Sequence, residues 1–599
     1  MVEDEAITFN RYGLLPWKEI LFYYPDTNQH TLFSLLSNLC MRLLGENEIF
    51  FRLPSFLAGV FSVPLLYVAG KTLSISNKAS FIGACLLAVS STHLNYSQQG
   101  RGYALTVFFA LTVILATTKL LENKGTPLWG GILIASGFCM ALALPSNGVF
   151  LAASGIYCFA AKSLDAIENR RFPDKNFISI SIAFGVLLLL VGVYFYLIYP
   201  GLKTAVKNYN YTPIDAAFFS QTALFLTAPW GYWAYSLVGI GLLDLKSKKE
   251  ISLISSLLGI PIIVMLALGI GGFSRTYIYL LPFVLLLAAQ GAAKTLDLLN
   301  NVSSIPRYVL SALLALGMTF APADNLIKRS TSPFPPGAAT ISEARQVFSY
   351  VQKEIPSGHF IVLWLPSETS VLNRYFAARL RQSMYNFAAG EKPDKIVLIS
   401  HLDAPPQNFS IGGYYANSSF NLPSDSLKLI KEIGNMRIHE LDKNISRFIP
   451  PSYNADYLAP VEIPESPVLA KKIEKKDKAL GETALKFEKN TSQNLALTSS
   501  AIKSVDIKKE GACLLTIYLR KYGQKSNALL ADYNPEQWPP KSIYINPYFG
   551  EFSAPGFDFN WQIVITISPM AAGRHNLVEV FDLIDQTSYF DGFQTFILS

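Results

Sequence analysis

The chain carries little charge and few cysteines or histidines. Only 16% of its 599 residues are Asp, Glu, Lys or Arg, whereas a soluble domain usually carries about 25%. The five cysteines are too scattered to form a disulfide framework, and no histidine lies at zinc-ligand spacing from a cysteine or another histidine. We therefore expect no disulfide scaffold and no cofactor; a divalent cation is an alternative that the sequence does not support.

Basic clusters and a leader sequence are missing as well. The formal net charge of +7 is spread along the chain without a basic run, so nucleic acid is not an expected partner. The first thirty residues lack the pattern of a cleavable signal peptide. Lysines in the loops of a membrane protein explain the charge best.

Apolar sequence dominates the first half of the chain. Ten segments before residue 323 are long enough, or nearly so, to cross a bilayer. Pro229 interrupts one of them, which we expect to form a re-entrant piece and a short helix. Residues 31–44 have helical spacing in a short segment, which indicates an interfacial helix. The ten segments are 53–70, 79–94, 103–118, 127–144, 147–161, 177–199, 219–243, 251–273, 276–293 and 307–322.

The distribution of Lys and Arg between the loops orients these segments. The loops that follow the first, third, fifth, seventh and ninth segments carry 13 basic residues, and the alternate loops carry 4. The positive-inside rule makes the first set cytoplasmic. The N-terminus, the Arg101 loop, Arg275 and everything after residue 323 are then extracytoplasmic.

The pattern changes after residue 325 to that of soluble protein. Residues 326–450 alternate helices with buried strands, which predicts a small α/β domain. Residues 451–499 are rich in Pro, Lys and Ser and indicate a linker, and residues 500–599 predict a β-sandwich. The expected fold is a mainly α membrane domain over residues 1–325, with about ten transmembrane helices, followed by these modules. The expected elements are helices at 341–354 and 367–388 and strands at 360–364, 396–399, 514–519, 543–545 and 561–567.

Three polar clusters stand beside the apolar segments. They are Glu3-Asp4-Glu5, the run from Asp26 to His30, and the run from Asn95 to Tyr103. Ionisable side chains next to a bilayer are costly and usually functional. Because the predicted topology puts all three clusters on the extracytoplasmic face, they predict a polar site at the membrane surface.

These clusters resemble a known family, the polytopic GT-C class glycosyltransferases that use lipid-phosphate-linked sugars, which include protein O-mannosyltransferases and aminoarabinose transferases. The resemblance covers roughly residues 1–325 and depends on the order and spacing of three blocks. The blocks are Asp4-Glu5-Ala6; residues 28–36 with 45–48 and 51–55; and residues 96–103.

The resemblance implies a site. The family's catalytic base is an aspartate in an acidic pair, which corresponds to Asp4, with Glu5 as its neighbour or substitute. Arg101 and Arg275 suit contacts to the donor phosphate by residue type and predicted side. The other residues expected to line the pocket are Asp26, His30, Arg52, Gln99, Tyr103 and Tyr277.

The implied activity is transfer of a hexosyl or pentosyl group from a polyprenyl-phosphate donor, with inversion, to an extracytoplasmic glycan, lipid or protein. A carboxylate takes the proton of the acceptor hydroxyl, and arginines stabilise the charge that grows on the departing phosphate. The lipid tail of the donor stays in the bilayer. We therefore expect an integral protein of a bacterial inner membrane that acts in the cell envelope.

The sequence departs from the family in two places. Relatives have a transmembrane helix before the acidic pair, whereas Met1 lies three residues from Asp4, so we expect that helix to be missing from the chain as given. Gln99 stands where many relatives carry glutamate. Both departures favour an alternative, a non-catalytic glycan-assembly or export protein that binds lipid-linked sugars. A transporter is a third interpretation, but its midplane charges are not found here.

Each candidate also has a simpler interpretation. The acidic triplet also fits a solvated charge run, and His30 fits an interfacial histidine hydrogen-bonded to backbone. Arg52 and Arg101 also fit helix-end side chains that reach along the bilayer to water. Arg275 and Tyr277 also fit an interfacial Arg/Tyr belt.

Overall fold

The structure is a computed structural model whose chain divides into two units. The helical unit comprises Tyr12–Ala338, and the mixed unit comprises Met1–Arg11 and Ala339–Ser599. The described residues are 3–13, 15–22, 24, 27–122, 127–169, 175–207, 213–245, 248–269, 271–300, 304–331, 341–364, 369–388, 394–402, 427–441 and, beyond 441, the strands β5 to β17.

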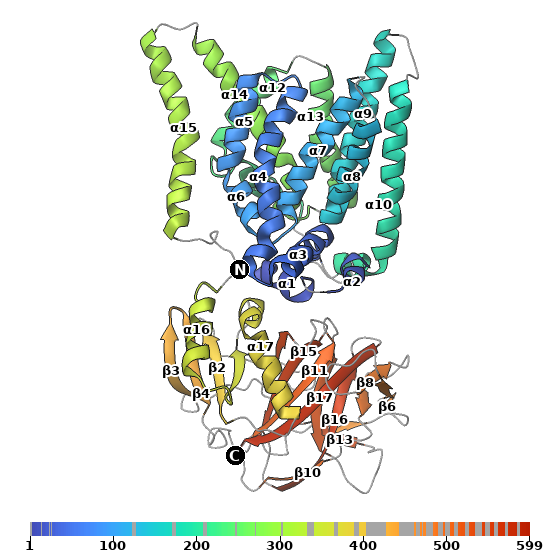
Figure 1. Ribbon diagram of the computed structural model, residues 1–599, viewed down its shortest axis with the longest axis vertical. Coiled ribbons are helices and arrows are strands. Elements are labelled where there is room, and N and C mark those ends of the chain that lie inside the picture. The colour runs from blue at the N-terminus through green and yellow to red at the C-terminus, as the bar shows by residue number, and fades with distance from the viewer. Residues whose placement is uncertain are drawn as a thin grey trace. The chain divides into compact units, whose positions relative to one another are not determined.

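Long apolar helices build the helical unit (Figure 1). Most of these helices run side by side, so that their apolar faces cover one another. The elements are α2 (Trp17–Phe22), α3 (Thr31–Leu44), α4 (Glu48–Thr72), α5 (Asn77–Val89), α6 (Ser91–Gln98), α7 (Tyr103–Leu121), α8 (Pro127–Ala143), η1 (Pro145–Asn147), α9 (Gly148–Asn169), α10 (Lys175–Lys207), α11 (Ala216–Thr227), α12 (Trp233–Leu243), α13 (Lys248–Leu268), η2 (Ser274–Leu280), α14 (Leu281–Leu299) and α15 (Ser304–Thr331).

Six helices among the described residues are long and apolar enough to cross a membrane, as expected of an integral membrane protein. They lie in α4, α7, α10, α13, α15 and the stretch from η2 through α14. Five further apolar helices are shorter, and two of the breaks have clear causes. Ser90 ends α5, and its hydroxyl accepts the N–H of His93 to cap α6. Pro229 separates α11 from α12, as the sequence predicts.

The core of the helical unit is formed by α7 and α14. In the most apolar stretch of α7, 78% of the residues are buried, and in that of the segment from η2 through α14, 83% are buried. In the most apolar stretch of α15 only 6% are buried. Figure 1 shows α15 at the rim of the bundle. Its apolar side chains therefore face the lipid in a membrane.

Two glycines allow α12 and α14 to cross closely. A Cβ added to Gly241 in α12 would overlap the carbonyl oxygen of Leu287 in α14, and one added to Gly291 would overlap that of Leu237. Small residues let helix backbones approach in a membrane, where lipid tails remove the hydrophobic drive for association.

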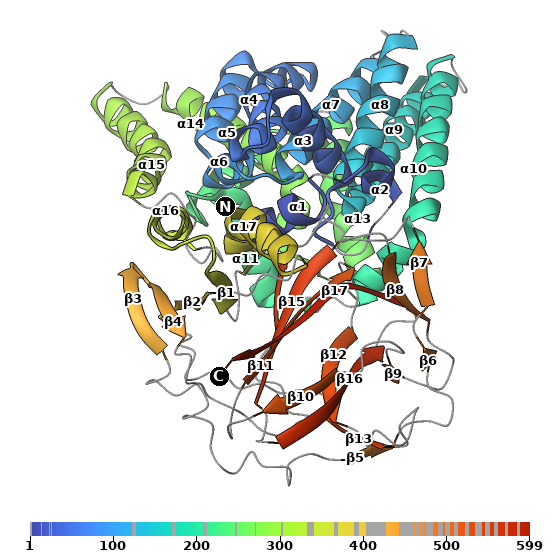
Figure 2. The ribbon, with the colours of Figure 1, turned by 60° about the horizontal axis from the view of Figure 1, so that its bottom comes forward.

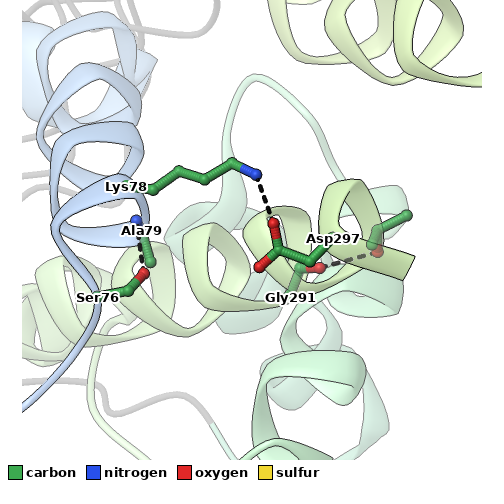
Figure 3. A network of polar contacts seen from close by, with 6 residues as sticks. Ser76, Lys78, Ala79, Gly291 and Asp297 are labelled. Atoms are coloured by element: carbon green, nitrogen blue, oxygen red, sulfur yellow. Dashed lines mark hydrogen bonds and ion pairs between the residues drawn. The ribbon is translucent and has the colours of Figure 1, made fainter. Parts of the chain in front are cut away.

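Ion pairs join the helix ends on the side that the sequence predicts to be cytoplasmic. The ammonium of Lys78 lies 2.8 Å from the carboxylate of Asp297, and Lys294 lies 2.9 Å from Asp244. Figure 3 shows the first pair, with the Ser76 hydroxyl accepting the Ala79 N–H beside it. Both pairs tie α14 to a neighbouring helix.

The mixed unit contains the predicted α/β alternation. The helices are α1 (Glu3–Arg11), α16 (Ala344–Glu354) and α17 (Thr369–Ala388). The strands β1 (Phe360–Trp364), β2 (Ile396–His401), β3 (Leu427–Ile433) and β4 (Met436–Leu441) form a sheet in the order β1-β2-β4-β3. The β1–β2 pair is parallel, because α17 crosses between the two strands.

Two further sheets, of seven and six strands, occupy the rest of the mixed unit (Figure 2). Residues 451–499, where the composition predicts a linker, contribute strands β5 to β9 to them. Leu485 and Phe487 alternate with polar neighbours in β8, and this alternation outweighs the linker-like composition. The strands are β5 (Pro460–Glu462), β6 (Val468–Leu469), β7 (Lys471–Glu474), β8 (Thr483–Glu488), β9 (Leu495–Leu497), β10 (Lys503–Ile507), β11 (Cys513–Lys521), β12 (Ser526–Asp532), β13 (Ser542–Ile545), β14 (Glu551–Pro555), β15 (Trp561–Pro569), β16 (Gly573–Leu583) and β17 (Thr587–Leu598).

Candidate functional site

The candidate site is built around Arg101, a buried arginine in the turn between α6 and α7. The side chain is among the largest that are fully buried, with 1% of the residue exposed. Its Nη1 donates to Oδ1 of Asn28 at 3.1 Å, and its Nη2 lies 3.0 Å from Nε2 of His30. The guanidinium also lies 5.7 Å from the ring centroid of Tyr103. A snorkelling arginine keeps its charged end in water, so the burial of Arg101 argues against that interpretation.

Glycine at position 102 lets His30 reach this turn. The backbone N–H of Gly102 donates to Nδ1 of His30 at 2.7 Å. A Cβ on Gly102 would lie 2.9 Å from that same nitrogen and 2.9 Å from the carbonyl oxygen of Ala143. The Ser55 hydroxyl in α4 donates to the carbonyl oxygen of Arg101 at 2.6 Å and fixes the turn from the other side.

The hydrogen bond from Gly102 determines which ring nitrogen of His30 carries the proton. A backbone N–H is always a donor, so Nδ1 accepts and the proton of the neutral ring is on Nε2. Nε2–H and Nη2–H of Arg101 are then two donors only 3.0 Å apart. Two donors cannot bond to each other, but one anionic oxygen can accept from both.

Charge and burial keep His30 neutral. Its pKa is held well below the usual range, first by complete burial and then by the positive charges of Arg101 and Arg275. Arg275, which stands in η2, therefore acts on the same site through its field. The backbone interpretation of His30 accounts for Nδ1 only, because Nε2 faces Arg101.

Aromatic rings line one side of the cluster. His30 meets Tyr103 edge-on, with 5.0 Å between the ring centroids, and Tyr96 lies 4.6 Å from Tyr103. Arg275 lies over Phe273, with its guanidinium carbon 4.8 Å from the ring centroid. The hydroxyl of Tyr277 donates to the carbonyl oxygen of Gly271, which orders the start of η2.

The remaining predicted residues have different environments. Arg52 lies 3.9 Å from Glu48 one turn earlier in α4, and Gln99 is half-buried at the end of α6. Asp4 and Glu5 lie in α1 of the mixed unit, where Glu5 is buried and Asp4 is half-buried. Asp26 lies outside the described residues.

The structure adds three residues to which sequence reasoning gave no role. Asn28 and Ser55 lie inside the blocks that carry the resemblance, and Gly102 directly follows Arg101. The Gly-Arg-Gly run was the available signal, because glycines on both sides of an arginine indicate a close backbone approach. Within the described ranges, no three His, Cys, Asp or Glu side chains are grouped so that they could hold a metal.

Comparisons of the whole chain gave likenesses to solved structures only. No family model and no curated protein matches the sequence. The structure of ArnT from Cupriavidus metallidurans bound to undecaprenyl phosphate matches with a TM-score of 0.47 and 11% identity, over 74% of this chain and 94% of that chain.

Two other similar structures are larger proteins. AglB, an oligosaccharyltransferase from Archaeoglobus fulgidus solved with an inhibitory peptide and a dolichol-phosphate, matches with a TM-score of 0.40 and 11% identity over 67% of this chain. The arabinosyltransferase EmbB from Mycobacterium smegmatis matches with a TM-score of 0.34 and 11% identity over 98% of this chain. The present chain spans 65% of AglB and 62% of EmbB.

Proposed function

We propose that this chain is a membrane glycosyltransferase of the GT-C class that moves a sugar from a polyprenyl-phosphate donor to an extracytoplasmic acceptor. The observation that carries the proposal is the pair of convergent donors on Arg101 and His30, 3.0 Å apart and both buried. Two donors that converge on one point suit a single anionic oxygen. Because the helices of this unit are long enough to cross a membrane, the anion that fits these donors best is one linked to a lipid.

Phosphate fits the donor geometry better than a single carboxylate. A phosphate presents several oxygens, so one oxygen can bridge Nη2 of Arg101 and Nε2 of His30 while another meets Arg275. Tyr96, half-buried beside Tyr103, is proposed to offer its aromatic ring to the sugar. Arg52, Gln99, Tyr277 and Asp26 are proposed to complete the pocket.

Asp4 is proposed as the base on the strength of the sequence blocks. The acceptor hydroxyl oxygen attacks the anomeric carbon, and a new C–O bond forms. The bond between that carbon and the phosphate oxygen breaks, and polyprenyl phosphate leaves with the electron pair. The hydroxyl proton passes to Asp4. Because attack comes from the side opposite the leaving group, the anomeric configuration inverts.

The proposed location is a bacterial inner membrane with residues 326–599 extracytoplasmic. The 13-to-4 distribution of basic residues between alternate loops supports this orientation. We also propose that the two larger sheets form a β-sandwich, since β11 and β12 lie in different sheets, as do β16 and β17. Connections that switch sheets are typical of that fold.

The test is transfer of radiolabelled sugar from a panel of polyprenyl-phosphate sugars in proteoliposomes. Asp4→Asn keeps size and polarity but cannot take the proton. We expect its transfer rate to fall by about 10² to 10⁴ while polyprenyl-phosphate binding stays native. Asp297→Asn removes a carboxylate from a peripheral ion pair and should transfer at the native rate.

Two results would reject parts of the proposal. A native rate in Asp4→Asn would remove Asp4 as the base and leave Asp26 or Glu5 as candidates. A native protein that binds polyprenyl phosphate but transfers sugar from none of the panel would instead be the non-catalytic assembly or export protein.

A further inference from the structure

Helix α1, which carries Asp4 and Glu5, is too short to be stable in isolation. It has nine residues, and isolated helices of fewer than about 12 residues are marginal in water. Burial of its side chains must therefore supply its stability. Of the seven residues from Asp4 to Asn10, whose burial is described, five are buried, namely Glu5, Ala6, Thr8, Phe9 and Asn10.

Helix α17 of the mixed unit provides the packing partner. The two helices pack together (Figure 2). The guanidinium carbon of Arg374 in α17 lies 3.9 Å from the centroid of the Phe9 ring, which is itself fully buried. A cation stacked this closely on an aromatic face gains from the ring quadrupole, and more so where water is excluded.

The face of α1 that meets Arg374 also carries Glu5. Residues four apart share a helix face, so Glu5 lies one turn before Phe9, and only 1% of it is exposed. Asp4 pairs in the same way with Thr8, whose hydroxyl donates to the backbone oxygen of Asp4. The two carboxylates therefore point in different directions, about 100° apart around the helix.

We propose that α17 positions α1, with Arg374 as the positioning residue. We further propose that Glu5 and Asp4 have different roles. Glu5 is committed to the packed face of α1. Asp4, half-buried on another face, is the acid that we assign to the chemistry. This inference rests on the proposed function for the role of Asp4.

Hydrogen exchange in the full-length protein in nanodiscs tests the packing without any substrate. In Arg374→Gln and in Phe9→Leu we expect the amides of residues 3–11 to exchange about threefold to thirtyfold faster, the range that a cation–π contact allows. Arg374→Lys should lie between these variants and the native protein. Arg437→Gln removes a half-buried arginine of the same unit that pairs with Glu432, and it should match the native protein.

The same exchange measurement, together with transfer kinetics, distinguishes the role of Glu5 from that of Asp4. Glu5→Gln should speed exchange of residues 3–11, whereas Asp4→Asn should not. In Arg374→Gln, kcat for transfer should fall while the Kd for polyprenyl phosphate stays native, and Arg374→Lys should recover part of kcat. A merely structural role in the mixed unit would not give this rescue.

Three outcomes would overturn the inference. One is native exchange of residues 3–11 in both Arg374→Gln and Phe9→Leu. The second is equal loosening in Arg437→Gln. The third is faster exchange in Asp4→Asn than in Glu5→Gln. Should Arg374→Gln disturb α17 itself, Phe9→Leu decides, because it leaves α17 unchanged. If the protein shows the expected exchange pattern but transfers no sugar, the proposed function is rejected and the packing of α1 on α17 is supported.

Discussion

At the scale of single residues, the site depends on one neutral histidine beside one buried arginine. The family resemblance pointed to His30, and residue type and predicted side pointed to Arg101. The tautomer of His30 was not predictable, because it is set by the Gly102 N–H, 72 positions away in the chain. The roles of all the site residues, Asp26, Gln99 and Arg52 included, stay predictions.

The neutral state of His30 gives stability a pH dependence. Its pKa is lowered in the folded protein by burial, Arg101 and Arg275, whereas in the unfolded chain it titrates near 6.5. As the pH falls below about 6.5, the unfolded chain binds a proton that the folded chain does not. The free energy of unfolding therefore decreases by up to about 1.4 kcal/mol for each pH unit below that value.

We expect the thermal midpoint in detergent to fall between pH 7.5 and 5.5, and part of that fall to vanish in His30→Gln. Glutamine can still accept from Gly102 but does not titrate. Identical pH profiles for the two proteins would show that His30 titrates normally and is not held neutral.

At the scale of elements, the sequence predicted most of the described helices but only a minority of the strands, and it missed some boundaries. Periodicity located α3, α16, α17, β1 and β2, and Pro229 marked the break before α12. The break at Ser90 was missed because residues 79–94 are continuously apolar or neutral, and the cap involves only the next three residues. The strands in 451–499 were missed because they are short and paired with distant strands.

The α12–α14 crossing can be tested with a matched pair of substitutions in α12. Gly241→Ala places a methyl group against the Leu287 carbonyl, whereas Gly239→Ala meets nothing within 4 Å. Overpacking of this kind typically costs about 1–3 kcal/mol. We expect a lower thermal midpoint for Gly241→Ala and a native or slightly higher one for Gly239→Ala. Equal midpoints would mean that the helices are not so close.

At the scale of the whole molecule, the sequence anticipated a membrane part followed by a soluble part. The structure assigns α1 to the mixed unit, although residues 1–325 were expected to form one membrane domain. Sequence alone could not show this, because the partner of α1 is more than 350 residues away in α17. Ten predicted spans compare with six helices of full length in the described part of the chain, and apolarity does not reveal where a helix breaks.

The orientation of the chain is open to a labelling test in spheroplasts. Cys513 lies in β11 of the mixed unit. If the basic loops are cytoplasmic, a membrane-impermeant maleimide should label Cys513 from outside, after mild unfolding of the exposed part. Cys513→Ser identifies the labelled peptide. Labelling that requires lysis of the membrane would reverse the orientation.

The central claim is that Arg101 and His30 hold a lipid phosphate, and the affinity for polyprenyl phosphate tests it most directly. A charge-assisted contact is worth about 1.5–3 kcal/mol, so Arg101→Ala should weaken binding roughly tenfold or more. Arg101→Lys should recover only part, because lysine lacks the two-pronged guanidinium. Arg307→Ala, at an exposed arginine beside Tyr308, serves as the control. The account predicts loss in Arg101→Ala and native affinity in the control; native affinity in Arg101→Ala would contradict it.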